Sequence, residues 1–256
     1  MSPGGVRTLR DEERSAFHAL GWLRCDDVLA CSVDELRTEV ARIGSWGDDG
    51  EWLQHYELTD SGRTLARTEN FTPFSDLLRE LLTEGAVPGI AGQLLGEEAV
   101  LYKEKINYKA PGGAGFSPHQ DKPAYPFVDA VLSVMIAVDD ATVDNGCLFV
   151  VDGGHGALLE QDHRGCIAPA VVESLDWHPV ELPAGATLFF HALTPHRSGP
   201  NATREPRRAL YPTYNGASEG MLRDAYYAEK RRVLASAGDD DRVHLSLIGD
   251  FEGRPA

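Results

Sequence analysis

Three side chains have the types and the spacing of a mononuclear metal site. His119 and Asp121 are separated by one residue and follow a glycine-rich turn. In an extended segment residues i and i+2 project to the same side, so both can bind one cation while Gln120 points away. A second histidine, His196, follows an apolar stretch. Two histidines and one carboxylate on one face leave three coordination positions open, enough for an oxidant and a chelating co-substrate.

The residues after His196 add an anion-binding feature. Arg207 stands eleven residues beyond His196, on the next predicted strand. Its guanidinium can offer two parallel hydrogen bonds to a dicarboxylate, and Ser198 can donate a further one. Arg208 is a competitor, but adjacent strand residues face opposite ways, so only one of the two can point inward, and the spacing favours Arg207. His191, on the same strand and turn as His196, is the main rival as a metal ligand.

These residues require a β core, and the sequence predicts one with helices in front of it. A capping box at Ser32 and Glu35 opens one helix, with Leu36, Val40 and Ile43 facing inward. Further helices are predicted over residues 10–23, 75–84, after Pro88, and over 219–235. From residue 98 the apolar period changes to two, which predicts strands at 99–109, 129–138, 147–151, 179–182, 186–192 and 207–214.

We therefore predict a single domain over residues 1–256. Its parts are a helical portion at about 10–97, a β core at about 98–215, and a C-terminal helix and tail at about 216–256. We expect the last fifteen or so residues to be poorly ordered, as chain ends often are.

Composition limits the partners. The chain has 24 basic against 40 acidic residues, a net charge of −16, which argues against nucleic acid because a phosphate backbone selects basic surfaces. No apolar run approaches the roughly 20 residues of a membrane span, so we expect no membrane partner and a cytoplasmic protein. Four cysteines without CxxC spacing are expected to be reduced. A monomer and a homodimer both remain open.

The combined motifs resemble the phytanoyl-CoA dioxygenase family of 2-oxoglutarate oxygenases. They are HQD at 119–121, HRSGPN at 196–201, RRAL at 207–210 and, upstream, KINYKAPGG at 105–113. The similarity runs from Phe17 to about Tyr214. It implies a mainly β fold with flanking helices around a double-stranded β-helix (jelly-roll, cupin-like) core. It also implies Fe(II), O2, and conversion of 2-oxoglutarate to succinate and CO2 with hydroxylation of a substrate.

The resemblance also assigns roles to individual residues. His119, Asp121 and His196 match the family's iron ligands. Arg207 matches the residue that pairs with the C5 carboxylate of 2-oxoglutarate, and Ser198 matches its hydroxyl neighbour. Arg67 falls where the family often has a basic residue that helps to hold the co-substrate. Relatives that halogenate have Gly or Ala in place of the carboxylate, so Asp121 favours hydroxylation or another oxygen-dependent outcome.

Four polar side chains on the predicted strand 99–109 share one face: Lys103, Lys105, Asn107 and Lys109. That face is either solvent, with lysines that oppose aggregation at a sheet edge, or the barrel interior. In the second interpretation Asn107 contacts 2-oxoglutarate. Lys103 and Lys105, together with Lys122, then receive an anionic substrate.

The stretch 103–121 looks most like bacterial members of the family that act on small phosphonates such as 2-aminoethylphosphonate. The first alternative is a hydroxylase of free amino acids or antibiotic scaffolds, whose cavity would be aromatic and could use Tyr125, Phe127 and Tyr211. A second is a zinc or manganese hydrolase or isomerase with the same ligands. A third is a catalytically silent cupin-like binding module, which predicts a broken ligand set.

Overall fold

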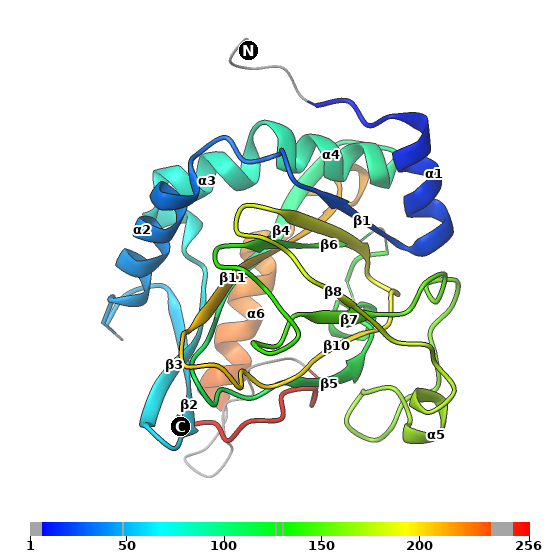
Figure 1. Ribbon diagram of the computed structural model, residues 1–256. Helices are drawn as coiled ribbons and strands as arrows, with labels where there is room; N and C mark the ends of the chain where they lie inside the picture. Colours follow the sequence, from blue (N-terminus) through cyan, green and yellow to red (C-terminus); the bar gives the residue numbers. More distant parts are fainter. Residues whose placement is uncertain (1–6, 48, 126, 130, 237–247) are drawn as a thin grey trace.

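Two antiparallel sheets form the core, and helices cover the outer face of the larger sheet (Figure 1). The computed structural model describes residues 7–47, 49–125, 127–129, 131–236 and 248–256. The strands are β1 (Trp22–Cys25), β2 (Leu53–Thr59), β3 (Gly62–Glu69), β4 (Ala99–Lys109), β5 (Phe116–His119), β6 (Val131–Ala137), β7 (Leu148–Val150), β8 (His178–Val180), β9 (Thr187–His191), β10 (His196–Ser198) and β11 (Arg207–Gly216). The helices are α1 (Asp11–Leu20), α2 (Val33–Gly44), α3 (Asp76–Thr83), α4 (Ala86–Leu95), α5 (Pro169–Val172) and α6 (Arg223–Ser236), with 3-10 turns η1 (Thr72–Phe74), η2 (Lys122–Ala124) and η3 (Ala217–Glu219).

The larger sheet has seven strands in the order β1-β9-β6-β11-β4-β3-β2, and the smaller has four in the order β5-β10-β7-β8. The predicted mainly β core with helices in front of it is therefore present. The six predicted strands correspond to β4, β6, β7, β8, β9 and β11. The sequence did not predict β5 and β10, the two strands of the smaller sheet that carry the candidate histidines.

The N-terminal portion, predicted to be helical over residues 10–97, also contains three strands, so that prediction was wrong for β1, β2 and β3. The hairpin of β2 and β3 was not predicted because a bulge at His55 and Tyr56 interrupts the alternation of apolar and polar residues. The helix predicted over 10–23 stops at Leu20 because Gly21 takes a left-handed conformation, with φ 84°. A Cβ at Gly21 would lie 2.4 Å from His155 Nδ1, so this position also excludes a side chain sterically.

The predicted helices are otherwise present. Ser32 caps α2, its side chain accepting from the Glu35 amide, and the three residues predicted to face inward are buried. Ser75 caps α3 in the same way. The C-terminal helix α6 begins at Arg223 instead of residue 219, and it packs on β4. Lys230 ties α6 to the sheet through a buried ion pair with Glu69 at 2.6 Å.

Alternation along the central strands separates the core from the cavity. On β6, Leu132, Val134 and Ile136 pack in the cluster beneath the helices. Met135 faces the other way, into the cluster between the sheets. Ser133, which shares its face, lines the cavity between the sheets. The sheet thus presents an apolar face to the helices and a partly polar face to the cavity.

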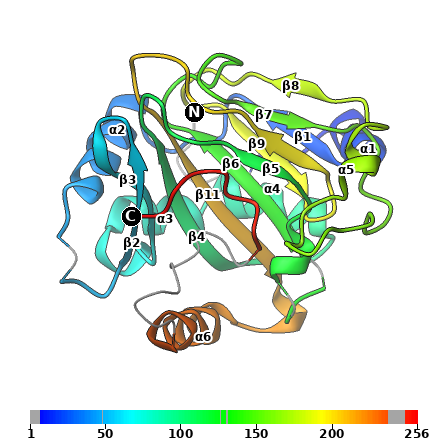
Figure 2. The same ribbon diagram turned by 90° about the horizontal axis from the view of Figure 1, so that it is seen from below.

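Residues 248–256 lie along the rims of both sheets, although we predicted poor order for the last fifteen residues (Figure 2). The Ser117 amide of β5 donates to the Asp250 carbonyl at 2.7 Å, and the Leu58 amide of β2 donates to the Arg254 carbonyl at 2.7 Å. This stretch, which we call the C-terminal strap, is therefore held by backbone pairing, so the expectation of disorder was wrong for it. Within the part of the chain that the structure describes, no helix is both long and apolar enough to cross a membrane.

Candidate active site

A cavity of about 500 Å³, counted to its open mouth, lies between the two sheets. The predicted site residues that line it are His119, Asp121, His196, Arg207, Ser198, Asn107, Lys105 and Tyr125.

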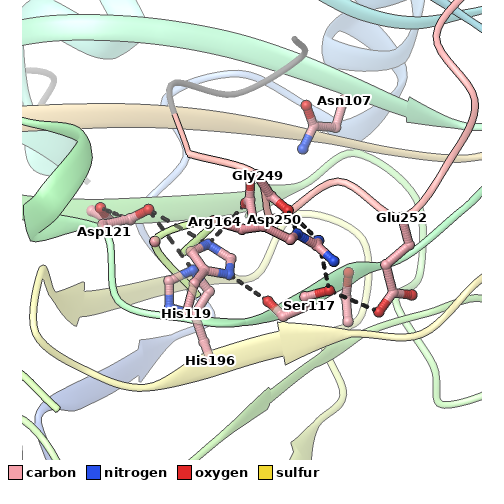
Figure 3. A network of polar contacts seen from close by, with 12 residues as sticks. Asn107, Ser117, His119, Asp121, Arg164, His196, Gly249, Asp250 and Glu252 are labelled. Atoms are coloured by element: carbon pink, nitrogen blue, oxygen red, sulfur yellow. Dashed lines mark hydrogen bonds and ion pairs between the residues drawn. The ribbon is translucent and has the colours of Figure 1, made fainter. Parts of the chain in front are cut away.

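Two histidines and an aspartate meet at the floor of this cavity. One possible ligand atom from each of His119, Asp121 and His196 lies within 4.8 Å of the others. Asp121 Oδ1 is 3.8 Å from His119 Nε2 and 3.9 Å from His196 Nε2. All three residues are buried, and Figure 3 shows their side chains converging. Among the described residues this is the one group of potential ligands with that geometry.

The two histidines are neighbours across strands, since His119 ends β5 and pairs with His196 at the start of β10. Asp121 reaches them differently from our expectation. Its backbone is helical, with φ −71° and ψ −28°, and it caps the turn η2. The carboxylate is therefore brought round by a turn, not by strand alternation. Gln120 does point away, as predicted, and its amide donates to the Leu193 carbonyl at 2.6 Å.

Hydrogen bonds orient each of the three side chains. His119 Nδ1 lies 2.7 Å from the Ser117 carbonyl, and His196 Nδ1 lies 3.0 Å from the Thr194 carbonyl. Each Nδ1 is thus the donor, which leaves Nε2 of both rings as the atom that can bind a metal in the cavity. Ser133 Oγ donates to Asp121 Oδ2 at 2.5 Å.

The electrostatics of the group suit a divalent cation. Burial, together with the neighbouring His119, lowers the pKa of His196 to about 4, so its ring is neutral at pH 7. Burial alone would raise the pKa of Asp121, but His196, Lys105 and His119 outweigh it and hold that pKa below its ordinary value. Two imidazoles and one carboxylate form a donor set that fits Fe(II) and leaves positions open.

Arg207 presents an unsatisfied donor to the cavity. The residue is 1% exposed. Its Nη2 donates to the Gly146 carbonyl at 2.8 Å, and its Nη1 lies 3.4 Å from the Tyr211 hydroxyl. Its Nε is buried without a hydrogen-bond partner. Arg208 projects from the other face, where it pairs with Asp139 at 2.8 Å. The guanidinium available to a carboxylate is thus that of Arg207.

Ser198 stands beside this arginine and is held by a lysine. Lys109 Nζ donates to Ser198 Oγ at 3.0 Å, so the serine hydroxyl hydrogen is free to donate elsewhere. The turn at Gly146 makes room for the lysine. Gly146 has φ 80°, and a Cβ there would lie 2.7 Å from Lys109 Nζ. The three side chains Arg207, Ser198 and Lys109 thus share one corner of the fold.

The polar face of β4 is interior, so its interpretation as a solvated edge was wrong. β4 lies between β3 and β11, and Lys103, Asn107 and Lys109 are all at most 7% exposed. Lys105 lines the cavity. Lys103 does not, since its ammonium lies 4.5 Å from the centre of the Tyr125 ring, behind the cavity wall. Burial lowers the pKa of Lys103 well below its ordinary value.

Three further predicted residues lie outside the main cavity. Arg67 donates to Asn107 Oδ1 at 3.0 Å and lines a smaller neighbouring cavity. Lys122 pairs with Asp129 at 3.1 Å, so the structure does not bring it to the metal ligands. His191 accepts from the Leu193 amide and is outside the ligand group.

Sequence reasoning missed Ser133 and Asp250, which line the cavity and contact the candidate ligands Asp121 and His119. Ser133 had a detectable signal, because it is the one polar residue in the apolar strand Val131–Ala137. Asp250 had none, since it is one of several acidic residues near the end of the chain. Its carboxylate Oδ2 lies 3.2 Å from His119 Nε2 (Figure 3).

Comparison with known proteins agrees with this geometry. The model of the family described as phytanoyl-CoA dioxygenase (PhyH) matches residues 17–209. A methylphosphonate hydroxylase from Gimesia maris is 45% identical over 97% of this chain and 98% of its own. A 2-aminoethylphosphonate dioxygenase from an uncultured bacterium is 38% identical over 86% of this chain and 84% of its own. The solved structure of EctD from S. alaskensis with 2-oxoglutarate and 5-hydroxyectoine superposes with a TM-score of 0.71 at 19% identity, over 82% of this chain and 77% of that one.

The fold and the site define a mononuclear non-haem iron oxygenase, built on the double-stranded β-helix that the sequence predicted. Fe(II), 2-oxoglutarate and O2 are its cofactor and co-substrates, and its substrate is a small molecule. The chain belongs to the phytanoyl-CoA dioxygenase family.

Proposed function

We propose that this enzyme hydroxylates a small phosphonate at a carbon next to phosphorus, as 2-aminoethylphosphonate or methylphosphonate would offer. The observation that carries the proposal is the ammonium of Lys105. Lys105 lines the cavity, and among the described residues no carboxylate lies within 4.0 Å of it. Lys105 is half-buried, and its ammonium lies 5.4 Å from the centre of the Tyr211 ring. A cation in this position, with no carboxylate at ion-pair distance, is suited to bind an incoming anion. The two relatives named above act, by their names, on phosphonates.

The far carboxylate of 2-oxoglutarate and the phosphonate of the substrate would each bind a different cationic side chain. We propose that Arg207 and Ser198 bind the far carboxylate of 2-oxoglutarate, because Arg207 Nε is buried and unpartnered and a planar fork suits a carboxylate. Asn107 lines the same cavity and Arg67 fixes its amide, so these two support the co-substrate from the neighbouring strand. Lys105 then remains for the phosphonate.

We propose that His119, Asp121 and His196 hold Fe(II), which supplies the site where O2 and 2-oxoglutarate react to hydroxylate the substrate. The chain's own part is to orient and to exclude water. The backbone carbonyls of Ser117 and Thr194 fix both imidazoles. The three ligands are buried, so the reaction is shielded from bulk solvent.

The experiment begins with anaerobic addition of Fe(II) and then 2-oxoglutarate to the purified protein. We expect a visible charge-transfer band, which His196→Ala abolishes. The control is His191→Ala, a histidine of the same strand and turn that lies outside the ligand group, and it should retain the band. Phosphonates are then added with O2, and hydroxylation is followed by phosphorus NMR and by succinate release. A normal band without phosphonate-dependent succinate would reject the substrate class, and free amino acids and antibiotic scaffolds would be screened next.

We also propose that the enzyme acts in the cytoplasm as a single domain, as a monomer or homodimer, without nucleic-acid or membrane partners. The net charge of −16 supports the absence of a polyanion partner. The four cysteines, all within the described residues, are free thiols, as a reducing compartment would keep them. Light scattering on the purified protein distinguishes a monomer from a homodimer.

A further inference from the structure

The C-terminal strap brings a carboxylate into the cavity. Strap residues pair with the segment around β5, the Asp250 carbonyl accepting from the Ser117 amide at 2.7 Å and the Glu252 amide donating to the Gly115 carbonyl at 3.1 Å. The Phe251 ring packs on the Phe116 ring, with centroids 5.4 Å apart. The position of the Asp250 side chain is therefore fixed by the backbone hydrogen bonds and the ring contact that hold the strap against β5.

This carboxylate is buried, and one of its two oxygens has no partner. Asp250 is 3% exposed and lines the cavity. Its Oδ1 is buried with no hydrogen-bond partner. Its Oδ2 lies 3.2 Å from His119 Nε2. This is the same nitrogen that the Nδ1 contact with the Ser117 carbonyl leaves facing the cavity.

Asp250 stands beside the candidate metal ligands without being one of them. Asp250 is not in the group whose ligand atoms lie within 4.8 Å of one another. Once Nε2 of His119 binds a metal, it has no proton to donate to Asp250. A buried carboxylate oxygen without a partner is destabilising. The loaded site thus needs a cationic or hydrogen-bond-donating group from the substrate at this position.

A cationic side chain, that of Lys105, lines the same cavity as Asp250. Lys105, on β4, and Asp250, on the strap, line the same space, with the metal ligands at its floor. The two charges influence each other, since the Asp250 carboxylate is among the groups that favour the charged form of Lys105. A cavity that offers one cation and one anion is complementary to a small zwitterion, and a plain alkylphosphonate would leave the anion unpaired.

We propose that Asp250 binds the ammonium group of the substrate and selects aminoalkylphosphonates over methylphosphonate. This inference rests on the proposed function, because the phosphonate end is held by Lys105. The carbon next to phosphorus then lies between the two charged ends, over the metal ligands. Asp250 is in this account a specificity-determining residue of the substrate pocket.

The test compares wild type with Asp250→Asn, which keeps the shape and removes the charge. Glu252→Gln is the matched control, because Glu252 is an exposed acid on the same strap that contacts Ser117 Oγ at 3.1 Å. Each protein is given 2-aminoethylphosphonate and methylphosphonate. We expect Asp250→Asn to lower the ratio of kcat/KM for the amino substrate to that for methylphosphonate by at least about tenfold. Glu252→Gln should leave this ratio unchanged.

A second readout does not depend on turnover. Under anaerobic conditions, 2-aminoethylphosphonate should perturb the charge-transfer band of the Fe(II) and 2-oxoglutarate complex at lower concentration in wild type than in Asp250→Asn. The band itself should be the same in both proteins. Loss of the band in Asp250→Asn would place this residue among the metal-binding groups and overturn the inference.

The outcomes separate the two proposals. If wild type accepts neither phosphonate, the proposed function fails. If it accepts methylphosphonate but not the amino substrate, or if Asp250→Asn weakens both substrates equally, the proposed function stands and the role of Asp250 is rejected.

Discussion

Ser133 Oγ donates a hydrogen bond to Asp121 Oδ2, joining the middle of β6 to the one carboxylate of the proposed iron site. Ser133 is 3% exposed, so water does not compete for this bond. The bond fixes which oxygen of Asp121 faces the histidines, and Oδ1 is the one that lies near both Nε2 atoms. An apolar strand thus orients a proposed metal ligand through its single hydroxyl.

Replacing Ser133 with Ala should weaken Fe(II) binding by about 10- to 100-fold, the usual cost of losing a hydrogen bond to a metal ligand. Titration of Fe(II) at saturating 2-oxoglutarate, followed by the charge-transfer band, measures this. Ser133→Thr keeps the hydroxyl and should bind Fe(II) more tightly than Ser133→Ala. Equal affinity for wild type and Ser133→Ala would show that the bond has no role in the site.

Arg207→Lys should raise the KM for 2-oxoglutarate by about 10- to 100-fold, because an ammonium cannot replace the bidentate fork. The control is Arg208→Lys, which changes the neighbouring residue on the opposite face of β11, where the side chain pairs with Asp139. That variant should keep the wild-type KM. A rise in KM for Arg208→Lys alone would reverse the assignment of the two arginines.

The pH dependence of kcat/KM for a phosphonate should follow Lys105. Burial and the nearby Arg67 lower the pKa of Lys105 to about 8, while the carboxylates of Asp121, Asp250 and Glu69 act in the opposite direction. Lys105 is cationic below this pKa, so kcat/KM should be highest below pH 8 and decline as the pH rises through it. Lys105→Arg should move the decline to higher pH. An identical decline in that variant would assign it to another group.

Lys230→Met should destabilise the fold by about 3–5 kcal/mol, since it leaves the buried Glu69 carboxylate without its ammonium partner. The double variant Glu69→Gln with Lys230→Met should recover part of this loss. The control is Arg232→Met on the same helix, whose exposed pair with Glu229 contributes little. Denaturant unfolding measures all three, and equal losses for Lys230→Met and Arg232→Met would contradict the account.

The sequence was most informative where the residues of one strand or helix alone determine its structure. Ser32 and Glu35 cap α2 as predicted, and the period of two over β4 placed Lys105 and Asn107 on one face. It was least informative where the structure depends on contacts distant along the chain. β5 and β10 are only four and three residues long, too short to show a period, and they form because they pair with each other.

The same limit applies to the site. His119 and His196 could be selected as a ligand pair because the family motif contains both. Their roles, and that of Arg207, stay predictions until they are tested. Asp250 could not be found, because its position depends on backbone pairing between the strap and the segment around β5. Whether Lys103 or Lys105 reaches the cavity was equally undecidable, since both lie on one face and only the packing of Tyr125 separates them.

The cross-strand pairing of His119 with His196 has a consequence for how iron enters and leaves. The backbone ladder fixes the separation of the two imidazoles before any metal binds. The entropic cost of bringing the two side chains together is therefore part of folding and not of metal binding. Metal loading then becomes a reversible event on a finished scaffold. An enzyme of this construction can lose its iron to a competing chelator and take it up again without passing through an unfolded state.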